Sequence, residues 1–369
     1  MPLSAFVVVL VAGIAALPPN VMPVLSGLLA DHHGLDDAQI GYFVSSGQLA
    51  GLIASATAPY WVTRVDVRWL VGACLVVYAL GVFALGRVMP LPLLCAIQFL
   101  LGGVLVLVAS SCFSILARLP NPARALSIKI SSDVVVASSF LYLLPIQRLG
   151  LDGFLAALAV SFVLGTLLAS RLPERPHAVQ PDVGIAKPAA RTPLGAWLAL
   201  ATMVVFYVAG ISMWVFLGRL ALHAGLDEDT AASVVAAGLF VGIVGALGAA
   251  SVAGRFRRIW PEVVAGVAFV VSLPALGLAR GVVEFALAAF AFNVAWNFFI
   301  PFLMGLVAAR DASGRLASLM PGTAMLGGIV GPPVAGLLMR ETSYPVATVA
   351  MSCFGAIAIA SYVMLARSR

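Results

Sequence analysis

Long apolar segments separated by short polar ones run along the whole chain. A transmembrane helix needs about 20 mostly apolar residues to cross about 30 Å of hydrocarbon, and twelve segments have roughly this length. The predicted spans are residues 3–30, 38–62, 69–89, 91–117, 125–147, 151–170, 194–222, 229–253, 261–279, 282–309, 316–339 and 344–366. The pattern therefore predicts an all-α polytopic membrane protein with twelve transmembrane helices.

The composition supports a membrane protein. Hydrophobic residues make up 62% of the chain and charged residues 10%, with a mean hydropathy of +1.09, whereas a soluble domain carries about 25% charged residues. No basic residue precedes the first span, which is also too long for the apolar core of a signal peptide. We therefore expect this span to be a retained helix.

Arginines and lysines indicate the orientation of the chain, because cytoplasmic loops carry an excess of them. Alternate loops and the two tails hold fifteen of the 21 basic residues. The loops on the other side hold four, namely Arg87, Arg148, Arg280 and Arg340. We expect a multi-pass protein of the bacterial inner (cytoplasmic) membrane with both termini in the cytoplasm. The same loops explain a sequence pI of about 9.5 without a nucleic-acid partner.

The second half of the chain repeats the first at an offset of 191 residues. GLDDAQIGYFVSSGQLAGLI, beginning at Gly34, aligns without gaps with GLDEDTAASVVAAGLFVGIV, beginning at Gly225. Self-similarity in one register indicates a duplication. The sequence therefore predicts two six-helix bundles, residues 1–170 and 194–369. The cytoplasmic linker between them, residues 171–193, is rich in proline and charge.

Polar residues inside the spans indicate where a binding site would lie. Paired helical halves around a midplane site are typical of secondary transporters. When the helices are counted in threes, the first ones carry Asn20, Gln98, Arg219, Asn293 and Asn297, and the second ones carry Gln48, Lys129 and Asp133. The third helices hold no charged residue, Asn or Gln in their interiors. Because polar groups are costly in hydrocarbon, we expect the third helices to face lipid and the first ones to line a wet cavity.

Two loops, PYWVTRVDVR and ASVAGRFRRI, follow the second helix of each half and contain Arg64, Arg68 and Arg255. Together with the distribution of polar residues, they resemble the major facilitator superfamily over essentially the whole chain. The family's signature in this loop is Gly-x-x-x-Asp-Arg-x-Gly-Arg-Arg, and its first helix of each triplet lines the cavity. The resemblance implies a cytoplasmic loop gate that includes the three arginines. The aspartate of the signature is absent from both loops, so the family's charge relay does not carry over intact.

A second motif, GGIVGPPVAG at residues 327–336, resembles the Gly-x-x-x-Gly-Pro-x-x-Gly-Gly signature of the family's antiporters. It lies in helix eleven, whereas those antiporters have it in helix five. Small residues four apart let helices approach closely, so we interpret the motif first as helix packing. Gln98 stands where the family's drug antiporters have an embedded arginine, which weakens the interpretation as a proton-driven multidrug exporter.

Lys129 and Asp133 form the most unusual pair in the sequence. They lie about 7 Å and 13 Å of helix rise beyond Arg124, and their spacing of four puts them on one helix face. One interpretation is a self-neutralising pair that only lets the helix insert. The second half, however, has Met320 and Ala324 at the equivalent positions, so the fold does not require the charges. We therefore predict that Asp133 takes up the coupling proton and that Lys129 then attracts an anionic group on the solute.

Other residues are candidates for solute binding. Asn20 lies in LPPNVMP, where prolines interrupt helical hydrogen bonds, and a broken helix beside a cavity often binds solute. The alternative is a kink satisfied by its neighbours. Amide and aromatic side chains also offer contacts, although core packing is the alternative for each aromatic one: these candidates are Gln48, Gln98, Tyr142, Tyr207, Trp214, Asn293, Trp296 and Asn297.

Arg219 lies one turn before His223, near the end of helix seven. We expect its side chain either to reach the outer membrane face or to contact the solute. His32 and His33 follow Asp31 at the end of helix one without further metal ligands nearby. A solvated helix end is the favoured interpretation, with proton entry as the alternative.

The sequence thus predicts a secondary active transporter of a small organic solute, coupled to protons. One embedded cation in excess favours an anionic or zwitterionic solute. The alternatives are a proton-driven efflux pump for amphiphilic drugs or metabolites and, in another class, a non-transporting sensor or scaffold. Motifs of metalloproteases, serine hydrolases and P-loop enzymes are absent from the sequence. We expect no enzyme activity, no cofactor or metal and a monomer in the lipid bilayer.

Overall fold

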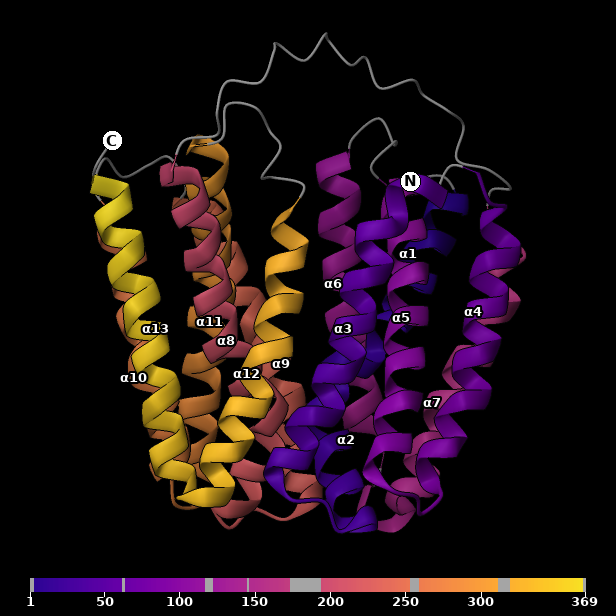
Figure 1. The fold of residues 1–369 in the computed structure, drawn as a ribbon, viewed down its shortest axis with the longest axis horizontal. Coiled ribbons are helices and arrows are strands. Elements are labelled where there is room, and N and C mark those ends of the chain that lie inside the picture. Colours follow the sequence, from indigo (N-terminus) through magenta and orange to yellow (C-terminus); the bar gives the residue numbers. More distant parts are fainter. Residues whose placement is uncertain are drawn as a thin grey trace, which may run out of the picture. The chain divides into compact units, whose positions relative to one another are not determined.

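The computed structural model describes residues 3–61, 64–116, 122–144, 146–172, 194–252, 259–310 and 319–367. These residues are helical apart from short turns (Figure 1). The helices of the first half are α1 (Leu3–Ala15), α2 (Leu17–His33), α3 (Asp37–Trp61), α4 (Val67–Val82), η1 (Phe83–Gly86), α5 (Leu91–Leu116), α6 (Pro122–Leu143) and α7 (Ile146–Ala169). Those of the second half are α8 (Leu194–His223), α9 (Glu228–Val252), α10 (Trp260–Leu278), α11 (Val282–Arg310), α12 (Met320–Glu341) and α13 (Tyr344–Arg367).

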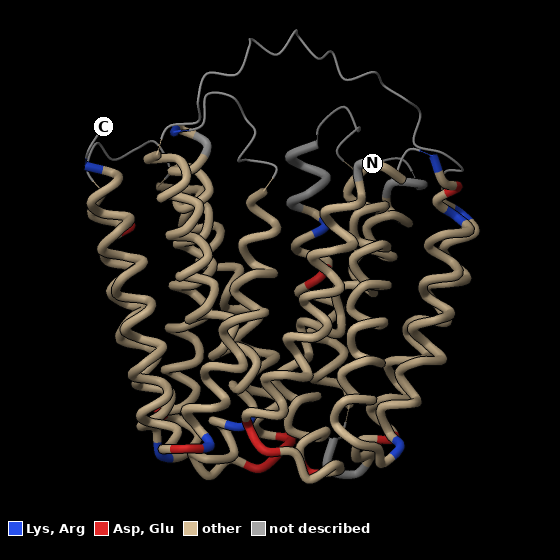
Figure 2. The backbone as a smooth tube through the Cα atoms, viewed as in Figure 1, with Lys and Arg blue, Asp and Glu red and all other residues tan. Residues whose placement is uncertain are grey.

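The twelve predicted spans match these helices to within a few residues, with α1 and α2 together forming the first span. Within the described residues, ten helical segments are long and apolar enough to cross a membrane. The prediction of an all-α polytopic membrane protein with twelve transmembrane helices is therefore confirmed. Figure 2 shows that charged residues gather mainly at the helix ends, as the cost of charge in hydrocarbon requires.

The first span is broken where its prolines begin. Ala16 separates α1 from α2, and prolines occupy the first turn of α2, because proline fits a helix start but cannot donate a backbone hydrogen bond inside a helix. Pro23 lies further along α2. The interruption predicted from LPPNVMP is thus present, as a new helix start at Leu17.

The chain divides into two compact units. Unit 1 comprises Met1–Leu35 and Tyr42–Pro181, and unit 2 comprises Asp36–Gly41 and Asp182–Arg369. The sequence prediction placed all of residues 1–170 in the first bundle, whereas the first turn of α3 is grouped with unit 2. The predicted linker lies almost entirely outside the described residues.

Helices at equivalent positions make equivalent pairs in the two units. In unit 1, α4 packs against α5 and α7, and α1 packs against α6 and α7. In unit 2, α10 packs against α11 and α13, and α8 packs against α12 and α13. These are the same pairs when the helices are numbered within each half, so the predicted two-repeat arrangement is present.

The turn after the first span has the same structure in both halves of the chain. Gly34 and Gly225 both have positive φ, at 64° and 91°, a conformation that glycine adopts without steric cost. Two residues later, Asp36 and Asp227 cap the next helix. The Asp36 side chain accepts a hydrogen bond from the backbone N–H of Gln39 at 2.8 Å. The Thr230 side chain and backbone donate to Asp227 and lower the pKa of this exposed carboxyl.

Candidate functional site

Lys129 and Asp133 form a buried ion pair on α6 of unit 1. Lys129 Nζ lies 2.5 Å from Asp133 Oδ2, and the two side chains are 10% and 14% exposed. The spacing of four along the helix creates this contact directly. The pairing predicted from the sequence is therefore present.

Neighbouring helices contribute one aromatic contact to the pair and close packing beside it. Lys129 Nζ lies 4.8 Å from the ring centroid of Phe113 on α5, within the range of a cation–π interaction. Gly13 of α1 approaches Ser132 so closely that a Cβ on this glycine would lie 3.1 Å from the Ser132 Oγ atom. The pair therefore lies on α6 beside α5, and the same segment of α6 packs against α1.

The carboxylate of Asp133 is incompletely satisfied. Its Oδ2 atom accepts a hydrogen bond from Lys129 Nζ, but its buried Oδ1 atom has no hydrogen-bond partner among the described residues. A buried acceptor without a donor is costly, and protonation would remove the charge at this position. Uptake of a proton by Asp133 would therefore compete with its ion pair to Lys129.

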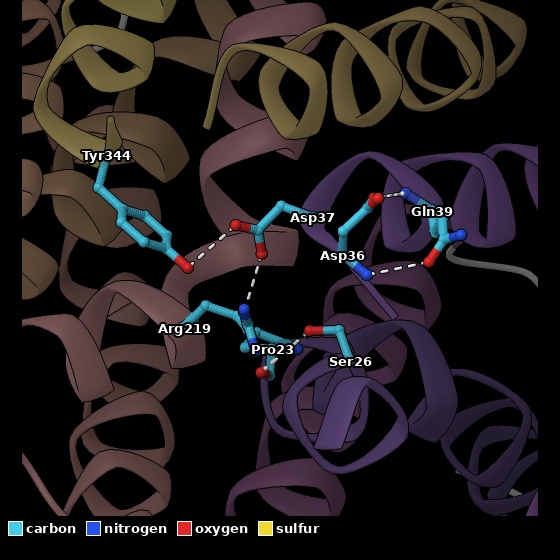
Figure 3. Close-up of polar contacts among 7 residues, drawn as sticks. All are labelled: Pro23, Ser26, Asp36, Asp37, Gln39, Arg219 and Tyr344. Carbon is cyan, nitrogen blue, oxygen red and sulfur yellow. Dashed lines mark hydrogen bonds and ion pairs between the residues drawn. The ribbon is translucent and has the colours of Figure 1, made fainter. Parts of the chain in front are cut away.

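Arg219 forms an ion pair near the end of α8. Its Nε atom donates to Asp37 Oδ1 at 2.9 Å, and the Tyr344 hydroxyl donates to Asp37 Oδ2 at 3.0 Å (Figure 3). Asp37 is 7% exposed, and the ring of His223 stacks on Tyr344 with centroids 4.7 Å apart. We call these four residues the Asp37 cluster. Sequence reasoning had found Arg219 and His223 but missed Asp37 and Tyr344.

The predicted solute contacts on α11 pack against other helices. The Asn293 side-chain amide donates to the carbonyl of Ala289 at 2.9 Å, and Asn297 donates to the carbonyl of Asn293 at 2.9 Å. A Cβ on Gly238 or Gly242 of α9 would lie 2.9 Å or 2.7 Å from these amides. The amides thus lie at the contact of α11 with α9, and a solute contact remains a prediction.

Trp296 belongs to an aromatic cluster in the core of unit 2. Its ring lies 5.2 Å from that of Phe206 and 5.6 Å from that of Tyr207. Tyr207 is buried, and Phe269 and Phe292 complete the packing around the indole. Trp296 and Tyr207 thus pack within this cluster, and their contact with a solute remains a prediction.

The amide candidates of unit 1 also lie close to backbone. The Asn20 side chain donates to the carbonyl of Ala16, the N-cap residue of α2, at 2.8 Å. The Gln98 side chain lies against Gly47, where an added Cβ would be 2.8 Å from its Nε2 atom. Gln48 is half-buried on α3. Each keeps an amide in a helix interior, and their roles in solute binding remain predictions.

Two further aromatic candidates differ in burial. Tyr142, near the end of α6, is 74% exposed, whereas Trp214 on α8 is half-buried. Among the described residues no group of three or more side chains suits a metal ion. His32 and His33 instead contact the carbonyls of Gly86 and Leu85 at 2.9 Å and 2.7 Å.

The arginines of the predicted loop gate have different surroundings. Arg68 Nε donates to the carbonyl of Leu172 at 2.5 Å, and Asp66 accepts from the Arg68 backbone. Arg68 therefore links the start of α4 to the chain just after α7 within unit 1. Arg64 is exposed, and Arg255 lies outside the described residues.

The GGIVGPPVAG segment of α12 provides close helix contacts. A Cβ on Gly327 would lie 2.5 Å from Tyr207 Cβ, and one on Gly331 would lie 2.5 Å from the Val208 carbonyl oxygen. One on Gly336 would lie 2.1 Å from the Asp37 carbonyl oxygen. Larger residues do not fit at these points, so the segment acts in packing, as interpreted from its small residues.

Two six-helix repeats with embedded polar residues define a class of protein, the membrane transporter built by duplication. A sequence profile described as Major Facilitator Superfamily matches residues 3–310. The chain therefore belongs to this family. No curated protein sequence matches it.

Solved structures with the same fold are distant in sequence. Nucleoside transporter NupG has 14% identity and a TM-score of 0.79, covering 99% of each chain. A D-xylose-proton symporter has 14% identity and a TM-score of 0.77, covering 98% of this chain and 97% of its own. The human organic anion transporter MFSD10 has 17% identity and a TM-score of 0.65, covering 97% and 98%. These likenesses show the fold.

Proposed function

We propose that the protein is a secondary active transporter of a small organic solute, anionic or zwitterionic, coupled to protons. In this proposal it works by alternating access in the bacterial inner membrane, with both termini in the cytoplasm. The observation that carries the proposal is the buried Lys129–Asp133 pair, in which one carboxylate oxygen has no hydrogen-bond partner among the described residues.

The pair supports coupling because one ammonium group cannot serve two anions at once. When Asp133 is ionised, Lys129 is held at 2.5 Å and neutralised. When Asp133 takes up a proton, Lys129 is released but keeps its contact with the Phe113 ring. It then offers a positive charge to an anionic group of the solute. Loss of the proton restores the ion pair, which competes with the solute and favours its release.

The second half of the chain supports a functional role for the charges. Met320 and Ala324 stand at the positions equivalent to Lys129 and Asp133. Each embedded charge costs about 2.5–3.5 kcal/mol on insertion scales, and the duplicated helix α12 forms without either one. Folding of the helix alone therefore does not explain why the pair is present.

Replacing Asp133 by asparagine is expected to abolish accumulation driven by a pH gradient. Asparagine keeps the size of the side chain but cannot take up or release a proton. The protein would be reconstituted in liposomes and tested with radiolabelled nucleosides, pentoses and organic anions. For the compound that the unchanged protein accumulates, uptake by D133N should fall to the level seen without a gradient, while exchange of the compound across the membrane continues.

Asp152→Asn provides the matched control, because this carboxylate lies in the same half but is exposed. Its gradient-driven uptake should equal that of the unchanged protein. Unchanged accumulation by D133N would refute the proposed coupling. A protein that binds a compound in a thermal-shift assay but never moves it would instead favour the sensor.

A further inference from the structure

An aromatic residue beside the Lys129–Asp133 pair is open, although the pair itself is buried. Phe113 of α5 is 42% exposed, while the side chains of Lys129 and Asp133 are 10% and 14% exposed. The Phe113 ring centroid lies 4.8 Å from Lys129 Nζ. We propose that the solute is an aromatic monocarboxylate, whose carboxylate pairs with Lys129 and whose ring packs on Phe113. This inference rests on the proposed function and names the class of solute.

The charges at the pair select a single negative charge on the solute. Arg219, counted from the sequence as an embedded cation in excess, is paired with Asp37 within unit 2. When Asp133 is protonated, as the proposed function requires, Lys129 is left with one positive charge, which a monoanion neutralises. A dianion would leave a negative charge in a buried place. A zwitterion would add a cation that protonated Asp133 no longer balances, and uncompensated buried charges are costly.

The position of the Phe113 ring favours a flat aromatic group next to the carboxylate. A charge-assisted hydrogen bond from an ammonium group to a carboxylate spans about 2.7–2.9 Å. The Phe113 ring centroid lies 4.8 Å from the same ammonium group. A ring bonded to the carboxylate therefore comes within the roughly 4.5–7 Å at which two aromatic rings attract each other. An aliphatic group of equal size would bury a similar area but would lack this attraction.

Another side of this segment of α6 is closed by α1. A Cβ on Gly13 would lie 3.1 Å from Ser132 Oγ and 3.5 Å from the Cγ2 atom of Val136, so α1 packs directly on α6 there. Cys112, the neighbour of Phe113 in the sequence, is fully buried. The exposed ring of Phe113 thus marks the side from which a solute approaches the pair.

The second half of the chain lacks all three members of this set. Met304 stands at the position equivalent to Phe113, and the equivalents of the charged pair are Met320 and Ala324. Met304 is 38% exposed, so the fold leaves this position similarly open in both halves, and packing does not require an aromatic residue there. Of the two equivalent places, the one in unit 1 carries both the ring and the charges, as expected of parts of one binding site.

Equilibrium binding to the purified protein tests the class of solute without a proton gradient. Isothermal titration calorimetry would compare benzoate with cyclohexanecarboxylate, which has the same charge and nearly the same size but no aromatic face. Benzoate should bind roughly 2- to 10-fold more tightly, the effect of one aromatic pair. Terephthalate, a dianion, and free phenylalanine, a zwitterion, should each bind at least about tenfold more weakly than benzoate.

Phe113→Leu is expected to remove the preference for benzoate, while the affinity for cyclohexanecarboxylate stays within about twofold because leucine keeps an apolar surface. Phe113→Tyr, which keeps the ring, should retain the preference. Phe99→Leu is the matched control, because Phe99 lies on the same helix and is 40% exposed; it should change neither affinity. Asp133→Asn, which holds residue 133 neutral, should still prefer benzoate.

The double variant Lys129→Met, Asp133→Ala should bind neither acid, and its thermal unfolding midpoint shows whether it is folded. Equal affinities of the unchanged protein for the two acids, or a preference that survives Phe113→Leu, would overturn the aromatic class but leave an anion site at Lys129. Tight binding of terephthalate or phenylalanine, binding of either acid by the folded double variant, or no binding by the unchanged protein would also overturn the inference. Failure of the proposed function is a separate result, namely gradient-driven accumulation that persists in D133N.

Discussion

Replacing Lys129 by methionine is expected to destabilise the protein by about 3–5 kcal/mol, because removal of one partner leaves the other charge buried and uncompensated. Asp133 is only 14% exposed, and its Oδ1 atom already lacks a partner among the described residues. In K129M the Oδ2 atom loses its donor as well. Thermal unfolding of the purified protein in detergent should show a lowered midpoint.

A second substitution separates the effect of an uncompensated charge from the effect of lost side-chain packing. Combining Lys129→Met with Asp133→Ala copies the residues that the second half carries at Met320 and Ala324. Replacing a buried ion pair by apolar residues is often neutral or stabilising, so this double variant should regain most of the midpoint lost in K129M. Transport driven by a pH gradient should remain absent. A double variant no more stable than K129M would show that the two charges do not compensate each other.

The bilayer explains why the fold could be predicted so closely. Every span must hide its backbone polar groups inside a helix about 20 residues long, so hydropathy alone located the helices. The repeat also predicted local detail, since Gly34 and Gly225 share a left-handed conformation. Hydropathy did not reveal the helix start at Leu17, where apolar residues continue across the break.

The candidate site could be predicted only where its contacts are local. Lys129 and Asp133 are four residues apart, so helix geometry alone brings them together. Asp37 lies 182 residues from Arg219 and 307 from Tyr344, and no sequence spacing indicates such contacts. Asp37 in the sequence looks like an ordinary acidic residue in the first turn of a helix.

Polarity alone did not reveal the partners of the amide side chains within the protein. Asn293 and Asn297 were predicted to face a cavity because amides are costly in hydrocarbon. In the structure each donates to a carbonyl of its own helix and lies against a glycine of α9. An amide can be satisfied in that way without solute or water, so a polar residue in a span indicates either a cavity or a close helix contact.

The contact between Gly210 and Trp296 should be among the least tolerant in unit 2. A Cβ on Gly210 would lie 1.1 Å from Cζ3 of the indole. The indole cannot easily move aside, because the buried rings of Phe206 and Phe269 lie 5.2 Å and 6.0 Å from it. Gly210→Ala is therefore expected to destabilise the protein by about 1–3 kcal/mol, the usual cost of overpacking a core, measured as a lowered midpoint of thermal unfolding.

A double-mutant cycle tests whether the indole is the cause. Trp296→Leu alone should also destabilise, since it leaves a cavity, but Gly210→Ala should add little to it because the clashing ring is gone. The coupling between the two changes should reach about 1 kcal/mol or more, as expected for residues in contact. Gly305→Ala is the matched control: nothing lies within 4 Å of its added Cβ, so the better helix propensity of alanine should leave stability unchanged or slightly higher. Additive effects of Gly210→Ala and Trp296→Leu would mean that α8 and α11 do not meet through this ring.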